Sequence, residues 1–240
     1  FHETHGGKVT LLAHPNGHPY DSDLLITDDS DCVLAMDEKN TVRNYWYENC
    51  VNAGIYILSG SLLTEMSELK KIDLEKDILK PLLHTKTVFA YKTPEYVKDA
   101  GTPERFKMVS SEQQNGVWAQ KCLRNKQKCI FLDRDGTINK FRGLVDRPEL
   151  FELEEKAVDA IKCINKAGYL TIVVTNQPVV ARGMCEIEDV DYIHKKMQTL
   201  LGEQGAYVDD IVFCPHHPDK GYPEENPLYK ISCNCRKPAI

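Results

Sequence analysis

The sequence contains no apolar run long enough to span a bilayer, and no secretory leader opens it. It also has no excess of positive charge, since 30 lysines and arginines stand against 36 aspartates and glutamates, giving a net charge of −6. We therefore expect neither a membrane-embedded protein nor a nucleic-acid partner. Internal repeats and low-complexity tracts are absent too.

Closely spaced cysteines are scarce. The chain has nine cysteines, an odd number, and six of them are scattered: Cys32, Cys50, Cys122, Cys129, Cys163 and Cys185. This pattern does not indicate a disulfide framework, so we expect a reducing, cytoplasmic location. With 240 residues, 42% of them hydrophobic, the chain can hold one large domain or two modest ones.

Two aspartates, Asp133 and Asp135, follow an apolar strand pattern that ends at Leu132, and a Gly-Thr pair comes directly after them. We expect both carboxylates at the carboxyl edge of a sheet, where open α/β folds bind ligands. Two acids so placed can share a divalent cation and divide nucleophilic and acid–base duties. Alone, the same spacing also fits a simple turn after a strand.

Two later segments extend this pattern. A second apolar strand pattern ends in Thr175 and Asn176, and two cations, Arg236 and Lys237, precede a proline. In this order the segments resemble the haloacid dehalogenase superfamily of phosphotransferases.

That resemblance implies roles for individual residues. Asp133 is expected to be the nucleophile and Asp135 the acid and base, with both at a magnesium site. Thr175 and Lys237 are expected to hold the phosphoryl group, and Asn176 is expected to take part in binding the substrate or its phosphate.

Three thiols and an imidazole bracket a proline-containing loop near the end of the chain. Cys214 and His216 precede the loop, and Cys233 and Cys235 follow it. This donor set suits a tetrahedral structural zinc with no position left for water. His217 is the one alternative to His216, and the thiols could instead be ordinary reduced cysteines.

The zinc loop narrows the resemblance. Together with the Ala-Arg-Gly around Arg182, it makes residues 128–240 similar to the D-glycero-D-manno-heptose 1,7-bisphosphate 7-phosphatases and to the related histidinol-phosphate phosphatases. Arg182 and Arg236 are then expected to hold a second phosphate. The chain departs from this family at Pro178, Val179 and Val180, where a Ser-Gly pair is usual, so substrate contacts from that loop are less secure.

Three short patterns in the first half resemble the later part of sugar-1-phosphate nucleotidyltransferases. They lie at Asn52, Glu75 and Asp99. The resemblance implies that Asn52 and Glu75 contact a sugar and that Asp99 helps to hold a catalytic magnesium. The glycine-rich phosphate loop of that family is absent, as are the carboxylates that complete a dehalogenase magnesium site after the lysine. We expect a piece of a longer bifunctional enzyme, itself weak or inactive in hydrolysis.

Strand and helix patterns alternate in the second half, with strands near residues 129–132, 170–174 and 208–213. This predicts an α/β fold, a Rossmann-like, three-layer arrangement with a parallel sheet and helices on both faces. In the first half, strands are predicted at 8–12 and 31–36 and a helix from residue 74, as part of an α/β nucleotidyltransferase domain. A polar stretch suggests domains at 1–112 and 128–240 with a linker at 113–127.

These patterns predict magnesium-dependent hydrolysis of a phosphate monoester through an aspartyl-phosphate. The preferred substrate is the 7-phosphate of a heptose 1,7-bisphosphate, because a fused nucleotidyltransferase could use the sugar 1-phosphate that remains. Histidinol phosphate is the alternative. Two other classes stay open: a zinc-stapled binding module without turnover, and a sugar nucleotidyltransferase with a non-catalytic tail.

Overall fold

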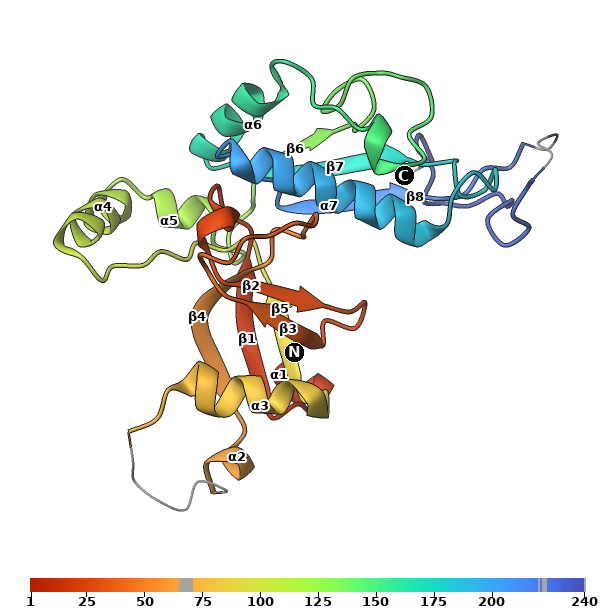
Figure 1. Ribbon diagram of the computed structural model, residues 1–240. Helices are drawn as coiled ribbons and strands as arrows, with labels where there is room; N and C mark the ends of the chain where they lie inside the picture. Colours follow the sequence, from red (N-terminus) through yellow and green to blue (C-terminus); the bar gives the residue numbers. More distant parts are fainter. Residues whose placement is uncertain (65–70, 220, 222–223, 240) are drawn as a thin grey trace.

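The first half of the chain forms a five-stranded sheet with mixed strand directions. The structure is a computed structural model that describes residues 1–64, 71–219, 221 and 224–239. The strands are β1 (Val9–His14), β2 (Leu24–Thr27), β3 (Val33–Asp37), β4 (Val51–Leu58) and β5 (Val88–Lys92). In the order β3-β2-β4-β1-β5, β1 pairs in parallel with β5 and antiparallel with β4 (Figure 1).

Short helical segments connect these strands. They are α1 (His2–His5), η1 (Pro19–Asp21), α2 (Gly60–Thr64), η2 (Leu74–Leu79), α3 (Lys80–Leu82) and η3 (Leu83–Thr85). The predicted strands at 8–12 and 31–36 correspond to β1 and β3, and the predicted helix begins at Leu74 as η2. Leu79 packs with Val9, Leu11 and Val88 in the core of this half, which holds η2 against the sheet.

The second half contains a three-stranded parallel sheet in the order β6-β7-β8. Its strands are β6 (Cys129–Leu132), β7 (Leu170–Asn176) and β8 (Asp210–Cys214). The predicted strands are confirmed, although β8 begins two residues later than expected. Asp209 accounts for the delay, because its carboxylate accepts a hydrogen bond from the Thr171 amide at 2.7 Å just before the strand starts.

Helices α6 (Ala157–Lys166) and α7 (Ile187–Glu203) cover the same face of this sheet. The crossovers from β6 to β7 and from β7 to β8 step in the same direction, so connections of one handedness place both helices on one side. On the opposite face, Phe131 and Val212 are 66% and 51% exposed. The expected three-layer arrangement is therefore wrong for the described residues, which form two layers here.

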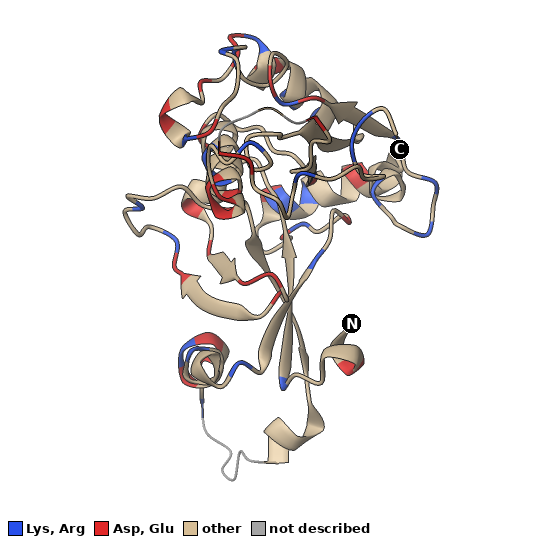
Figure 2. Cartoon of the chain, turned by 90° about the vertical axis from the view of Figure 1, so that its right-hand side faces the viewer, with Lys and Arg blue, Asp and Glu red and all other residues tan. Residues whose placement is uncertain are grey.

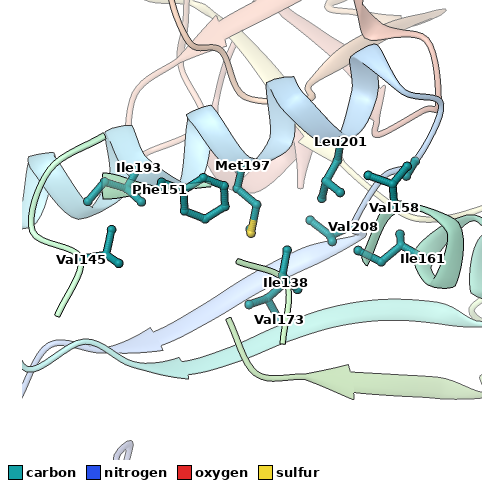
Figure 3. Close-up of a cluster of buried hydrophobic side chains, with 11 residues drawn as sticks. Ile138, Val145, Phe151, Val158, Ile161, Val173, Ile193, Met197, Leu201 and Val208 are labelled. Atoms are coloured by element: carbon teal, nitrogen blue, oxygen red, sulfur yellow. The ribbon is translucent and has the colours of Figure 1, made fainter. Parts of the chain in front are cut away.

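The core of the second half lies between this sheet face and the two helices (Figure 3). Val173 in the central strand faces Met197 of α7, and the loop after β6 adds Ile138. The other buried members are Val145, Phe151, Val158, Ile161, Ile193, Leu201, Ala206 and Val208. Ile138, buried three residues after Asp135, anchors the chain beyond the two aspartates, and the short helix η4 (Pro148–Leu150) follows later in the same connection.

The polar seam between the halves is partly helical rather than an irregular linker. Helix α4 (Pro103–Gln114) extends into it, and α5 (Val117–Gln120) lies within it. Thr102 caps α4 by accepting a hydrogen bond from the Arg105 amide, and Pro103 occupies the first turn. No residue of α4 is buried, so its polar composition reflects exposure rather than disorder. The domain boundaries themselves stay predictions.

The two halves meet along α7. The main-chain amide of Tyr47 donates to the Thr199 hydroxyl at 2.9 Å, and the Asn49 amide donates to Gln198 at 2.9 Å. Among the described helices, none combines the length and the apolar character that crossing a bilayer requires.

Candidate active site

The carboxyl ends of β6 and β7 bring together the residues that the motifs singled out. Asp133 directly follows β6, and its side chain is about half exposed. One carboxylate oxygen accepts from the Arg134 amide at 2.8 Å, and the other lies 3.0 Å from Lys237 Nζ. The predicted nucleophile and the predicted phosphate-binding lysine are thus neighbours, although 104 positions separate Asp133 from Lys237 in the sequence.

Lys237 is held in place by the end of β7. The side chain of Asn176 accepts a hydrogen bond from the Lys237 amide at 3.0 Å and donates to the Lys237 carbonyl at 3.2 Å. Lys237 Nζ also donates to the Val174 carbonyl at 2.7 Å. Because both ends of the Asn176 amide bind the Lys237 main chain, Asn176 holds the lysine in place, and its contact with a phosphate stays a prediction.

Asp135 lies in a dense hydrogen-bond network. Its carboxylate accepts from Arg134 Nε at 3.2 Å, from Arg134 Nη2 at 3.0 Å, from Asn139 at 3.1 Å and from Gln177 at 2.7 Å. Gly136, at φ +78°, turns the chain directly after it, a conformation that favours glycine. Since Asp135 Oδ1 and Oδ2 both face protein donors, the carboxylate is oriented before any ligand binds.

Thr175 is buried beside this network, at 2% exposure. Its hydroxyl oxygen accepts from Gln177 Nε2 at 2.9 Å, while Gln177 Oε1 accepts from Arg134 Nη2 at 2.7 Å. Its own hydroxyl hydrogen remains available as a donor. Gln177 therefore links the end of β7 to Asp135.

The two aspartates fit a magnesium ion in different ways. The Asp133 side chain is accessible, and carboxylate oxygens are ligands that suit a hard cation. The Asp135 carboxylate is engaged by protein donors, whereas its main-chain oxygen accepts no hydrogen bond within the described part of the chain. Of the predicted ligands, Asp133 thus offers a carboxylate and Asp135 a carbonyl.

The second predicted metal cluster is assembled from both ends of the loop that follows β8. The ligand atoms of Cys214, His216, Cys233 and Cys235 all lie within 4.8 Å of one another. The three sulfur atoms are 3.3 to 3.5 Å apart, and His216 Nδ1 lies 3.3 Å from the Cys235 sulfur. Four donors around one zinc would be separated by about 3.8 Å when each Zn–S bond measures about 2.3 Å. The cluster therefore fits a tetrahedral ion.

The alternative ligand His217 lies outside this cluster. It is buried, and its Nδ1 accepts from the Asp219 amide at 3.1 Å. Burial raises the pKa of the Cys214 thiol to about 12, so a bound cation would be needed to hold it as a thiolate.

The predicted second-phosphate arginines flank the same loop. Arg236 donates to the His216 carbonyl at 3.1 Å. Burial lowers the pKa of His217, and the charges of Arg236 and Arg182 act in the same direction, whereas Asp219 opposes them. Lysines, arginines and acidic residues are interspersed over both halves (Figure 2), so charge alone does not mark one surface as the site.

The segment Pro178-Val179-Val180 has a packing role. Val179 and Val180 are fully buried with Val190 of α7 in a cluster that also contacts Phe213. A Cβ on Gly183 would come within 1.6 Å of the Glu224 carbonyl, so the two loops approach each other there at backbone distance. The departure from the expected Ser-Gly pair is therefore accommodated by apolar packing.

The residues predicted in the first half are only partly brought together. Asn52 Nδ2 donates to the Glu75 carboxylate at 3.0 Å, and the Tyr56 hydroxyl donates to the same oxygen at 2.7 Å. Asp99 does not contact either predicted partner: it precedes α4, is exposed, and pairs with Arg105. Figure 1 shows α4 far from η2 and α3.

Four residues of the site were not predicted: Arg134, Asn139, Gln177 and His194. Arg134 lies between the two aspartates, where the motif assigns no role, yet its side chain is fully buried. His194 follows Ile193 on the buried stripe of α7, so helical periodicity could have marked it.

Part of the chain is similar to known heptose-bisphosphate phosphatases. D-glycero-β-D-manno-heptose-1,7-bisphosphate 7-phosphatase of Photorhabdus laumondii is 41% identical over 109 residues, which cover 45% of this chain and 56% of the relative. The enzyme of the same name from Haemophilus influenzae is 40% identical over 111 residues, 46% of this chain and 58% of the relative. No protein-family model matches. The predicted resemblance to heptose-bisphosphate phosphatases is confirmed for this part of the chain, and the resemblance of the first half to sugar nucleotidyltransferases stays a prediction.

The solved structures give a similar partial match. The D,D-heptose 1,7-bisphosphate phosphatase from B. bronchiseptica, complexed with magnesium and phosphate, is 34% identical, with a TM-score of 0.40 over 47% of this chain and 57% of that one. The chain spans a little over half the length of the curated relatives it matches.

Proposed function

We propose that the second half of this protein hydrolyses a sugar phosphate monoester through an aspartyl-phosphate. The observation that supports this most directly is the approach of Lys237 Nζ to the Asp133 carboxylate, at 3.0 Å, beside an independently anchored Asp135. Asp133 can attack phosphorus, Lys237 can neutralise the phosphoryl oxygens, and Asp135 can move a proton.

The proposed first step transfers the phosphoryl group to the protein. A carboxylate oxygen of Asp133 attacks phosphorus, and the bond between phosphorus and the sugar oxygen breaks. Asp135, in its carboxylic acid form, gives its proton to the departing oxygen. Lys237 and the Thr175 hydroxyl hold the oxygens of the phosphoryl group.

The second step restores Asp133. Asp135, now a carboxylate, takes a proton from a water molecule whose oxygen attacks phosphorus, and the acyl–phosphate bond breaks to release inorganic phosphate. A magnesium ion held by Asp133 and the Asp135 carbonyl would neutralise charge on the phosphoryl oxygens.

The proposed substrate is a heptose 1,7-bisphosphate, from which the 7-phosphate is removed. The similarity to phosphatases named for this substrate supports the choice, and Arg182 and Arg236 near the loop could hold the second phosphate. Histidinol phosphate is the competing substrate. We expect the protein expressed from its complete gene to release one phosphate per heptose 1,7-bisphosphate with magnesium and to leave the 1-phosphate in place. A preference for histidinol phosphate would contradict the substrate choice.

We propose that the Cys214, His216, Cys233 and Cys235 cluster holds a structural zinc. Metal analysis should find about one zinc per chain in the wild type and nearly none in Cys233→Ser, with a lower melting temperature. Cys163→Ser is the matched control, because Cys163 is exposed and outside the cluster. A zinc-free wild type of equal stability would contradict the assignment.

A sugar nucleotidyltransferase activity of the first half is a second proposal. The contact of Asn52 with Glu75 favours it, because an amide, a carboxylate and the Tyr56 hydroxyl in one place can bind sugar hydroxyls. The separated Asp99 offers no such support. Saturation-transfer NMR with a heptose 1-phosphate, comparing wild type with Glu75→Ala, tests this half alone.

A further inference from the structure

His194 of α7 reaches the aspartate site from outside the predicted motifs. Its Nε2 lies 3.3 Å from Arg134 Nη1, and both side chains are almost completely buried. A guanidinium group can only donate, so Nε2 must be the acceptor and the ring proton must sit on Nδ1. Burial, reinforced by the Arg134 charge, lowers the pKa of His194 to about 3, which agrees with a neutral ring at physiological pH.

Arg134 connects this histidine to Asp135. Its Nε and Nη2 donate to the Asp135 carboxylate, Nη2 also donates to Gln177, and Nη1 is directed to His194. Within the described residues, His194 Nε2 is the atom that accepts a hydrogen bond from Arg134 Nη1. Without it, a charged N–H would lie buried with no partner, and the guanidinium would shift toward another acceptor.

The other side of His194 faces a cavity of about 550 Å³ between the two halves, lined also by Asp191 and Lys195. The rings of His194 and Phe213 pack in an edge-to-face arrangement, with their centroids 5.1 Å apart. Phe213 and the helix backbone therefore define the ring plane, and Nε2 is left pointing toward the guanidinium. The contact with Arg134 follows from packing on α7 and not from the aspartate motif.

We infer that His194 is a positioning residue for the proposed hydrolysis, fixing the Asp135 carboxyl through Arg134. The inference rests on the proposed function. Proton transfer from Asp135 to the leaving oxygen requires the donor within hydrogen-bond reach of that oxygen as the phosphorus–oxygen bond breaks. A guanidinium held at Nη1 as well as at Nε and Nη2 keeps the carboxyl in one orientation. Without His194 it would be held only on the side of Asp135 and Gln177, and its Nη1 end could move.

The test uses substrates that differ in their need for this proton. A sugar phosphate expels a strongly basic alkoxide and needs protonation, whereas 4-nitrophenyl phosphate expels a weakly basic phenolate and needs little. The variants are His194→Gln, whose amide oxygen can take the place of Nε2, His194→Asn, which is one methylene shorter, and His194→Leu, which has no acceptor. The quantity is kcat/KM, because it reports the steps through departure of the leaving group.

We expect His194→Leu and His194→Asn to lose about tenfold or more in kcat/KM on heptose 1,7-bisphosphate and less than about threefold on 4-nitrophenyl phosphate. His194→Gln should stay within about threefold of wild type on both. Melting temperatures identify variants that fail to fold. If His194→Leu fails to fold, His194→Gln and His194→Asn are compared with each other instead.

Equal losses on the two substrates, or rescue by Asn as good as by Gln, would show a purely structural role and overturn the inference alone. All kinetic measurements use the protein expressed from its complete gene, and a wild type of that protein that releases phosphate from neither substrate would remove both the proposed function and the inference. The two failures are thus distinguishable.

Discussion

Two arginine–aspartate pairs in this chain have the same chemistry and opposite surroundings. Arg134 pairs with Asp135 with its side chain fully buried, and Arg105 pairs with Asp99 with both side chains more than half exposed. Burial lowers the pKa of Arg134, and the nearby Asp135 opposes that change. Asp99 accepts one further hydrogen bond, from the Gly101 amide two residues along the chain at 2.7 Å.

The difference in burial between Arg134 and Arg105 shows where the protein holds a charged group in an environment that disfavours it. Removing a guanidinium from water is unfavourable unless hydrogen bonds compensate for it, and Arg134 has compensation from Asp135, Gln177 and His194. An exposed pair costs little and specifies little. The buried network therefore holds the Asp135 carboxyl in one orientation, and among the described residues no such network surrounds Asp99. A second buried pair, Arg43 with Asp37, lies in the first half outside the predicted sites, so burial alone does not identify a functional site.

The largest expected effect is on the proposed nucleophile. Asp133→Asn should lower phosphate release from heptose 1,7-bisphosphate by at least about a thousandfold, because an amide cannot form the acyl phosphate. Asp99→Asn, the matched change in the other region, should leave phosphate release unchanged. The measurement is phosphate release by the protein expressed from its complete gene, with mass spectrometry of acid-quenched protein to find phosphate on Asp133. Activity of Asp133→Asn near wild type would refute the mechanism.

The next effect is on stability and separates the two pairs directly. Arg134→Met should lower the free energy of unfolding by about 3 to 5 kcal/mol, because it leaves Asp135 and Gln177 without their buried partner. Urea unfolding followed by circular dichroism gives the value. A loss below about 1 kcal/mol would mean that the network relaxes or admits water, and the contrast with Asp99 would then carry no functional meaning.

The sequence predicted the parts of this site that depend on strand ends. Asp133, Asp135 and Thr175 follow short apolar runs, and the register of parallel strands brings such ends to one edge. The cysteine cluster was predictable for a related reason. Its four ligands form two pairs, and the members of each pair are only two residues apart, so the sequence already places them side by side. Lys237 required family resemblance, because its place beside Asp133 depends on the loop closing.

The remainder depended on packing between separate segments. Arg134 and His194 come into contact only because α7 packs across the sheet, and no local sequence pattern predicts how a helix packs on a sheet. The two-layer arrangement also escaped prediction, because periodicity shows that helices are amphipathic but not which face of the sheet they cover. In the first half, Asn52 and Glu75 meet, whereas Asp99 lies apart on a loop whose course the sequence did not specify.

A third prediction concerns the pH dependence of stability. The pKa of His194 is lowered from 6.5 to about 3 in the folded protein, so the unfolded state binds a proton that the folded state refuses. Stability from this residue is complete above pH 6.5 and is lost as the pH falls toward 3, by about 3 kcal/mol between pH 7 and pH 4. Urea unfolding of wild type and His194→Gln at both pH values measures it. Parallel losses in the two proteins would contradict a buried neutral histidine.

The smallest effect is expected at the exposed pair. Arg105→Met should change the free energy of unfolding by less than about 0.5 kcal/mol, because water and salt already screen a surface ion pair of this kind. It is the matched counterpart of Arg134→Met, since the residue types and the substitution are the same and only burial differs. A loss of about 2 kcal/mol or more would show that Asp99 and Arg105 hold the loop before α4 in place. Asp99 would then have to be reconsidered as part of the predicted nucleotidyltransferase site in the first half.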